Sequence, residues 1–138
     1  MKVHDYHLGN LQLQDMFGTR KLAERLANRA TEALEPDHRA MVENANMFFL
    51  ATCDERGLPT VSYKGGEPGF VRVIDDQTIA FPNYDGNGKF QSMGNVLQNP
   101  NVGILFIDFE GQLRLRLQGE ASINDNDLLM AEYHEAQF

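Results

Sequence analysis

The residues best suited to carry out chemistry lie between positions 60 and 89. This stretch contains two lysines, Lys64 and Lys89, together with five glycines and several hydroxyl and amide side chains. Lysine offers a point charge to a phosphate, glycines let backbone N–H groups approach an anion, and small polar side chains can satisfy the polar atoms of a ring. The composition favours a site for a phosphorylated planar cofactor. It leaves open the alternative of a run of hairpins whose glycines only make turns.

Short strands are expected to position these groups. Residues 59–64 alternate, so Thr60, Ser62 and Lys64 should share one face of a strand while Val61 and Tyr63 share the other. Residues 1–18 show no clear period and are expected to form an arm. Five further strands are expected at 47–53, 69–74, 78–81, 102–107 and 113–123, and helices at 20–34, after Pro36, at 90–98 and at 125–133.

Six short strands with tight turns and flanking helices predict a mainly β, α+β fold built on a small antiparallel barrel. Residues 102–107 are apolar at nearly every position, which predicts cover on both faces and favours a homodimer. We expect one domain over residues 1–138. It would comprise an N-terminal arm and helices at 1–45, the barrel at 46–123 and a C-terminal helix at 124–138.

Composition and charge restrict the class of protein. The formal charge of −8 argues against nucleic-acid or anionic-membrane partners, because the acidic residues would repel phosphates. A single cysteine, Cys53, excludes an internal disulfide framework and fits a reducing compartment. The sequence shows neither an apolar run long enough to span a bilayer nor the apolar centre of a signal peptide. These features predict a cytoplasmic protein.

Other chemistries find little support in the sequence. Gly88-Lys89 lacks the surroundings of a nucleotide-binding P-loop, and there is no Gly-x-Ser-x-Gly elbow. Cys53 is expected to be a buried small hydrophobe, and the four histidines are dispersed, so no metal site is predicted. No residue stands out as a general base, and the catalytic residue stays unassigned.

A series of short motifs in a defined order carries a resemblance to a known family. The chain resembles pyridoxamine 5′-phosphate oxidase-related proteins, which are split barrels that dimerise and hold flavin mononucleotide (FMN) between subunits. The motifs are Phe49-Leu50-Ala51-Thr52, Gly57-x-Pro59, Val61-Ser62-Tyr63-Lys64-Gly65-Gly66-x-Pro68-Gly69-Phe70-Val71, Asn83-Tyr84-x-Gly86-Asn87-Gly88-Lys89, Asn99-Pro100-x-Val102-Gly103 and Leu115-Arg116-x-x-Gly119-x-Ala121.

The resemblance implies a cofactor role for each part of these motifs. Thr60, Val61, Ser62, Tyr63 and Lys64 correspond to the strand that contacts the flavin ring and ribityl chain. Phe81, Pro82, Asn83 and Tyr84 correspond to the segment before the phosphate ligand, which would be Lys89 supported by Asn87. Gly88 stands where the family often has arginine, which implies a weaker grip on the phosphate. Arg114 lies near a position that reaches the ring from the partner subunit.

Two departures from the family pattern affect the expected reaction. True pyridoxamine phosphate oxidases hold the substrate phosphate with a tyrosine, an arginine and a serine beyond the sixth strand. Here Tyr133 is followed by His134-Glu135-Ala136-Gln137, and no arginine follows Arg116, which argues against the vitamin reaction. Relatives also continue with a further strand, so the resemblance implies that a C-terminal strand is missing.

The resulting hypothesis is an FMN-binding homodimeric oxidoreductase that acts on a small molecule, with a nicotinamide as a candidate electron donor. The flavin would carry the two-electron chemistry while the protein supplies position and electrostatics. Three alternatives stay open. They are a deazaflavin-dependent reductase, a haem-binding or haem-degrading relative, and a flavin-binding carrier or sensor without turnover.

Overall fold

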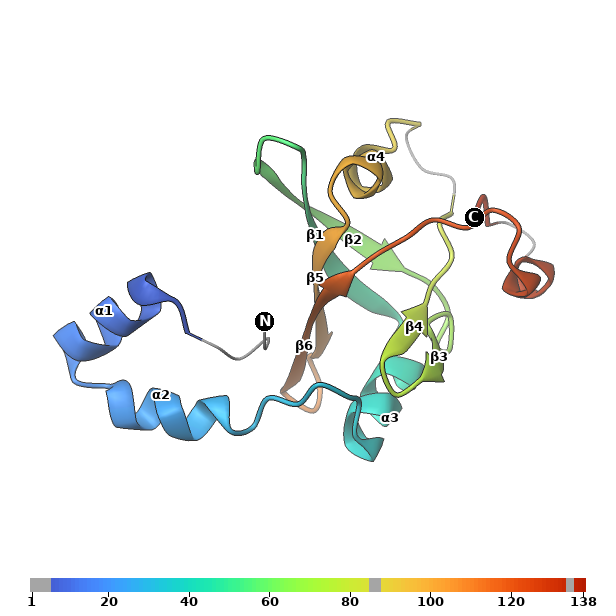
Figure 1. The fold of residues 1–138 in the computed structure, drawn as a ribbon. Helices are drawn as coiled ribbons and strands as arrows, with labels where there is room; N and C mark the ends of the chain where they lie inside the picture. Colours follow the sequence, from blue (N-terminus) through green and yellow to red (C-terminus); the bar gives the residue numbers. More distant parts are fainter. Residues whose placement is uncertain (1–5, 85–87, 134–135) are drawn as a thin grey trace. The chain divides into compact units, whose positions relative to one another are not determined.

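The computed structural model describes residues 6–84, 88–133 and 136–138 (Figure 1). These residues divide into two compact units, one formed by residues up to Leu34 and the other by Glu35–Phe138. Within the described residues, no helix has both the length and the apolar character that a membrane span requires.

The first unit contains two helices, α1 (Leu8–Phe17) and α2 (Arg20–Ala27). The expected arm over residues 1–18 is therefore wrong for residues 8–17. Helix α1 begins at an N-terminal cap: His7 Nδ1 accepts hydrogen bonds from the N–H groups of Gly9 and Asn10. The apolar residues of this segment form no clear stripe that would have predicted the helix. The helix ends at Gly18, which has a left-handed φ of 69°.

The helix expected over 20–34 is shorter in the structure and ends at Ala27. Its side chains are not buried, so packing adds little to a short helix that is marginal on its own. Arg20 joins the two helices through an ion pair to Asp15, at 2.8 Å, and the Tyr6 hydroxyl donates to the Ala23 carbonyl at 2.7 Å.

The second unit is built on a four-stranded antiparallel sheet in the order β2-β1-β5-β6 (Figure 1). A separate two-stranded hairpin is formed by β3 and β4. All six predicted strands are present, and the described strands form the split barrel without closing it. The strands are β1 (Met47–Cys53), β2 (Pro59–Gly65), β3 (Arg72–Asp75), β4 (Thr78–Ala80), β5 (Asn101–Asp108) and β6 (Leu113–Glu120).

The core of this unit lies on one face of the four-stranded sheet. Phe48 is fully buried and contacts the rings of Phe70, Phe81 and Phe106, with centroid distances of 5.9, 4.9 and 5.3 Å. Helix α3 (Pro36–Asn44) contributes the fully buried Val42. The other buried apolar residues are Leu50, Val71, Met93, Val96 and Ile104.

Alternation along the strands leaves the opposite face of the sheet uncovered by the second unit's own core. On β1 and β5, Ile104 and Phe106 are buried with Phe48, whereas Phe49 and Leu105 on the other face are only half-buried. We expected both faces of β5 to be covered, but within the described residues only the face with Ile104 and Phe106 is buried.

Helix α4 (Gln91–Gln98) confirms the helix expected at 90–98. It packs against β1 and β2 and buries Met93 and Val96. The helix expected at 125–133 is reduced to a 3₁₀ helix, η1 (Leu128–Glu132), which Asp127 caps by accepting from the Leu129 N–H at 2.9 Å. An Asp-Asn-Asp run before it favours turns over an α-helical start.

Residues 136–138 lie beside the end of the β4 segment. The Asn83 N–H donates to the Phe138 carbonyl and the Gln137 N–H donates to the Asn83 carbonyl, both at 2.8 Å. The Asn83 side chain also donates to Gln137 Oε1 at 3.1 Å. This pairing brings the end of the described chain next to residues that the sequence assigns to the cofactor.

Candidate functional site

Strand β2 presents its polar residues on the face that the core and α4 cover. Its register places Ser62 opposite Leu50 and Lys64 opposite Phe48, both of which are buried. Val61 and Tyr63 point the other way and are 71% and 63% exposed. The alternation expected from the sequence is therefore confirmed, and it places Ser62 and Lys64 on the covered side.

A pocket of about 320 Å³ lies where β2, the segment after β4 and the start of α4 meet. It brings together five residues predicted for the cofactor: Ser62, Tyr63, Lys64, Asn83 and Lys89. Its remaining lining residues are Tyr84, Gly88, Phe90, Gln91, Ser92, Met93 and Gln137.

The Ser62 hydroxyl in this pocket has no hydrogen-bond partner among the described residues, although its oxygen is buried. A buried hydroxyl without a partner costs roughly 1–3 kcal/mol relative to a satisfied one. A ligand with a polar atom at this position would remove that cost. Since Ser62 lines the pocket, its hydroxyl is a group that a bound polar ligand could pair with.

Lys64 is half-buried, and no carboxylate in the described part of the chain forms an ion pair with it. Burial lowers the pKa of its ammonium group because the charged form loses solvation. An anion bound in the pocket would stabilise the charged ammonium group and so offset its lost solvation. Lys89 lines the same pocket, so two lysines of a chain of net charge −8 lie there together.

Replacing Lys64 with methionine is expected to raise the free energy of unfolding by up to about 1 kcal/mol at neutral pH. Since the pKa of Lys64 is lower in the folded state, the folded state binds fewer protons than the unfolded state between that pKa and the ordinary lysine value. Stability should rise with pH through this window in the parent and less so in Lys64→Met. Urea denaturation at neutral pH and near the ordinary lysine pKa measures this; an identical pH dependence in the two proteins contradicts it.

The start of α4 adds a second positive feature to the pocket. Its N-cap residue, Phe90, has a left-handed φ of 51° and provides no side-chain cap, while Gln91 and Ser92 of the first turn line the pocket. First-turn N–H groups have no acceptor within a helix, and the helix dipole favours negative charge there. The combination with two lysines suits a phosphate.

A buried polar network holds α4 against the sheet. The Thr52 and Thr60 hydroxyls lie 2.9 Å apart, and the Asn95 amide donates to them at 3.1 and 3.3 Å. Thr52 is 1% exposed. The Thr60 hydroxyl, one of the groups predicted to contact the flavin, is thus engaged with α4 and does not line the pocket. It acts in the fold by fixing the helix whose first turn faces the two lysines.

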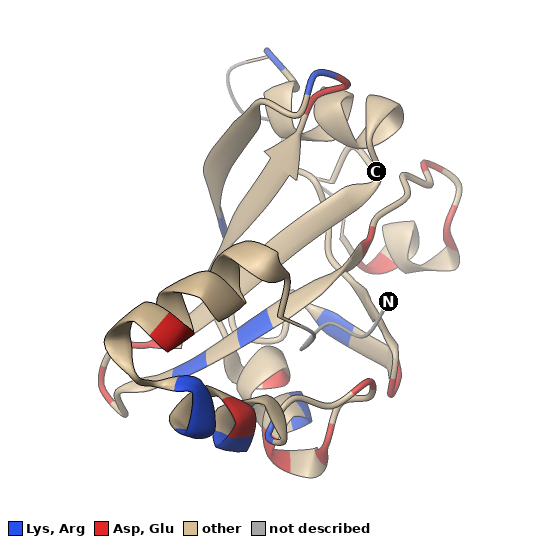
Figure 2. Cartoon of the chain, turned by 60° about the vertical axis from the view of Figure 1, so that its left-hand side comes forward, with Lys and Arg blue, Asp and Glu red and all other residues tan. Residues whose placement is uncertain are grey.

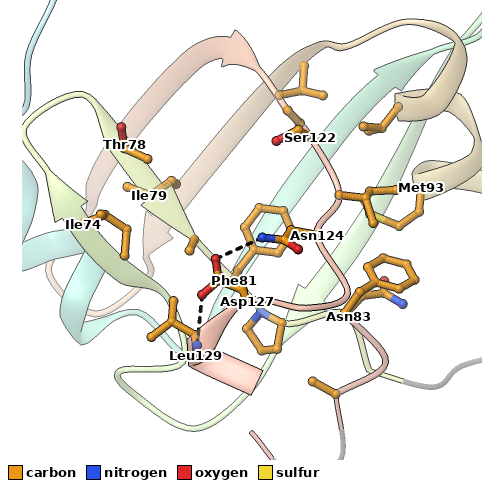
Figure 3. Close-up of a pocket in the computed structure, with 18 of the residues that line it drawn as sticks. Ile74, Thr78, Ile79, Phe81, Asn83, Met93, Ser122, Asn124, Asp127 and Leu129 are labelled. Carbon is orange, nitrogen blue, oxygen red and sulfur yellow. Dashed lines mark hydrogen bonds between the residues drawn. The ribbon is translucent and has the colours of Figure 1, made fainter. Parts of the chain in front are cut away.

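Phe81 and Pro82 line a second, larger cavity of about 510 Å³, beside the β3–β4 hairpin (Figure 3). Phe81 packs edge-on against Phe48 in the core. Asn83 lines both cavities, so the predicted segment 81–83 forms part of the wall between them.

Arg114 lies on the opposite face of the sheet from the pocket. It is paired with Ile107 across β5 and β6, and it is exposed together with Arg116. The chain itself does not bring Arg114 to Lys64. The predicted phosphate-supporting residue Asn87 lies outside the described residues. In Figure 2 the acidic residues fall mainly on loops and helices, and the strands carry the basic residues Lys64, Arg72, Arg114 and Arg116 with Asp75, Asp108 and Glu120 at strand ends.

Sequence reasoning missed three polar residues of the smaller pocket: Gln91, Ser92 and Gln137. The first two could have been found from their place at a helix start beside Lys89. Gln137 carried no such signal, since its position depends on pairing with Asn83, 54 residues away.

The second unit is a split barrel with a pocket that two lysines line at the start of a helix. A family model described as pyridoxamine 5′-phosphate oxidase matches residues 34–137, so the chain belongs to the pyridoxamine 5′-phosphate oxidase family. No curated protein matches the sequence.

Several solved structures share the fold. HupZ of Group A Streptococcus is 23% identical with a TM-score of 0.56, and the match covers 72% of this chain and 73% of that chain. A protein described as a putative pyridoxamine 5′-phosphate oxidase from Lactobacillus delbrueckii is 20% identical with a TM-score of 0.57, covering 75% and 78%. HutZ, described as the haem storage protein from Vibrio cholerae, is 23% identical with a TM-score of 0.51, covering 72% and 69%.

Proposed function

We propose that the protein is an FMN-binding oxidoreductase that acts on a small molecule and holds its cofactor in the smaller pocket. The observation that carries this proposal is the buried, unpartnered Ser62 hydroxyl beside the half-buried Lys64, in a pocket that Lys89 also lines. A phosphate carries the negative charge that both lysines attract. The polar atoms of a planar ring can form a hydrogen bond with the Ser62 hydroxyl.

The residues present fit FMN in two parts. Lys89 and the first turn of α4 would hold the phosphate, since both favour negative charge. Ser62 and Lys64 would bind polar atoms of the flavin, with Asn83 and Gln137 closing the wall. When bound, the flavin supplies two-electron transfer, and the protein's part is to orient it and to set the charge around it.

The uncovered face of the sheet supports a homodimer. It presents the exposed side chains of Val61, Tyr63, Arg114 and Arg116 next to the half-buried Leu105. A mixed face of apolar side chains and arginines is typical of a protein interface. In the proposed dimer this face meets a second copy, and the family resemblance assigns Arg114 to the contact between the two subunits.

The vitamin reaction itself is not part of the proposal. The Tyr133 hydroxyl, which the resemblance compares with the family's substrate-binding tyrosine, donates to the Phe70 carbonyl at 3.0 Å and accepts from Arg72 Nε at 3.0 Å. Arg72 also pairs with Glu132. Because its hydroxyl already donates one hydrogen bond and accepts another within the protein, Tyr133 has a structural role. We therefore propose that the substrate is a different small molecule. We also propose that a nicotinamide is the electron donor and that the protein works in the reducing cytoplasm.

Haem binding is the second candidate because HutZ is described as a haem storage protein. Two histidines in the described residues are already occupied: His7 caps α1, and His38 Nδ1 accepts the Glu35 N–H at 3.1 Å. Their role as caps favours flavin over haem. A deazaflavin-dependent reductase would differ from the main proposal in the cofactor that it binds. A flavin carrier without turnover would differ in that no donor reduces its flavin.

The deciding experiment is an absorption spectrum of the purified protein, followed by chromatography of the cofactor that heat releases. We expect a flavin spectrum and FMN in the supernatant, and light scattering of the same sample should give the mass of two chains. A Soret band, a released deazaflavin, or a colourless protein that takes up no added FMN would each contradict the proposal. A nicotinamide that bleaches the flavin band would separate an enzyme from a carrier.

A further inference from the structure

The larger cavity of the second unit has the properties of a separate ligand site. Its volume of about 510 Å³ falls within the range of roughly 300–1,000 Å³ typical of small-molecule pockets. It is bounded by the core face of β1 and β5, by the β3–β4 hairpin and by the segment that follows β6 (Figure 3). The labelled side chains of Ile79 on β4, Met93 on α4 and Leu129 on η1 come from three different parts of the chain and line the space.

The charges of this cavity are opposite in sign to those of the smaller pocket. Its lining contains two carboxylates, Glu120 and Asp127, and neither lysine nor arginine among the described residues. The smaller pocket is lined by Lys64 and Lys89 and contains no acidic residue among those described. A ligand that carries a carboxylate or phosphate would lose solvation in the larger cavity without meeting a cation.

A fixed polar edge gives the cavity a means of orienting a ligand. Asp127 accepts from the Leu129 N–H at 2.9 Å and from the Asn124 amide at 3.4 Å, and both bonds are drawn in Figure 3. These bonds hold the carboxylate in place, and an ionised carboxylate has further lone pairs for a donor. Thr78 and Ser122 add hydroxyls to the same lining.

We infer that the larger cavity binds an apolar small molecule, neutral or cationic, whose ring or branched chain contacts the aliphatic and aromatic walls. Its hydroxyl or amino group donates to the polar edge at Asp127. The site is distinct from the proposed flavin pocket, with which it shares only the wall residues Asn83 and Met93. The inference does not depend on flavin binding.

Three naphthalene derivatives of equal ring size test the charge preference. They are 1-naphthalenemethanol, 1-naphthylmethylamine and 1-naphthoate, each titrated by calorimetry and in competition with the neutral fluorescent probe N-phenyl-1-naphthylamine. We expect the alcohol and the amine to bind and to displace the probe, and the naphthoate to bind at least about tenfold more weakly, since burying an unpaired carboxylate is costly. Equal binding of the naphthoate, or no binding of any compound, would overturn the inference.

Two tryptophan variants on the same 3₁₀ helix place the binding. Met130 lines the cavity and is half-buried, whereas Leu128 is 93% exposed and lies outside it. Met130→Trp should fill the cavity and weaken alcohol binding at least about tenfold, while Leu128→Trp should bind as the parent does. Should Met130→Trp fail to fold by circular dichroism, Ser122→Trp at the exposed edge of the lining replaces it. Undiminished binding in the folded filling variant, or an equal loss in Leu128→Trp, contradicts the assignment.

Discussion

Replacing Lys89 with alanine is expected to weaken FMN binding about 10- to 100-fold while leaving riboflavin binding nearly unchanged. The reason is that riboflavin lacks the phosphate that Lys89 is proposed to hold, whereas the ring contacts from Ser62 and Lys64 stay the same in both ligands. A hydrogen bond to a charged group contributes roughly 1.5–3 kcal/mol. Fluorescence titration of each flavin with the apoprotein measures both affinities.

Lys21→Ala serves as the matched control, because Lys21 is an exposed lysine of the first unit and lies outside both cavities. It should bind both flavins as the parent does. A loss of FMN and riboflavin affinity by the same factor in Lys89→Ala would show that the substitution disturbs the pocket as a whole. Unchanged FMN affinity would remove Lys89 from the phosphate site.

Replacing Phe48 with alanine is expected to lower the free energy of unfolding of the second unit by about 3–5 kcal/mol. Phe48 has no exposed surface, and its ring contacts three other aromatic rings of the core. Its removal leaves a cavity at the centre of the sheet that these rings cannot fill without shifting. Urea denaturation followed by circular dichroism gives the change.

Phe109→Ala is the corresponding control, since Phe109 is 70% exposed and its loss should change stability by less than about 1 kcal/mol. The contrast between the two phenylalanines tests where the core lies. Comparable changes in the two variants would mean that Phe48 is not the residue around which the other rings pack.

The strands were predictable because alternation along each one records which face is buried. The expected face of Ser62 and Lys64 is confirmed by the register of β2 against β1. Lys64 and Lys89 line one pocket although they are far apart in sequence, and the order of the motifs between them indicated this. Residue types and the family resemblance therefore indicated that both lysines belong to one site, and their role toward a cofactor stays a prediction.

Other features depend on contacts that leave little trace in the local sequence. Helix α1 starts because His7 caps it, and a histidine cap is hard to recognise when the apolar residues show no clear stripe. Thr60 was expected to face a cofactor, yet its hydroxyl bonds Thr52 and Asn95. Strand alternation indicates the face on which a side chain lies but not the partner that it meets there.

The pairing of Asn83 with Gln137 and Phe138 bears on how the two cavities form. Two backbone hydrogen bonds close a loop of more than fifty residues, and such a closure has a larger entropic cost than the local β5–β6 hairpin. Because Asn83 lines both cavities, loss of its pairing with Gln137 and Phe138 would remove part of the wall of each, so we expect a change at this residue to affect both sites.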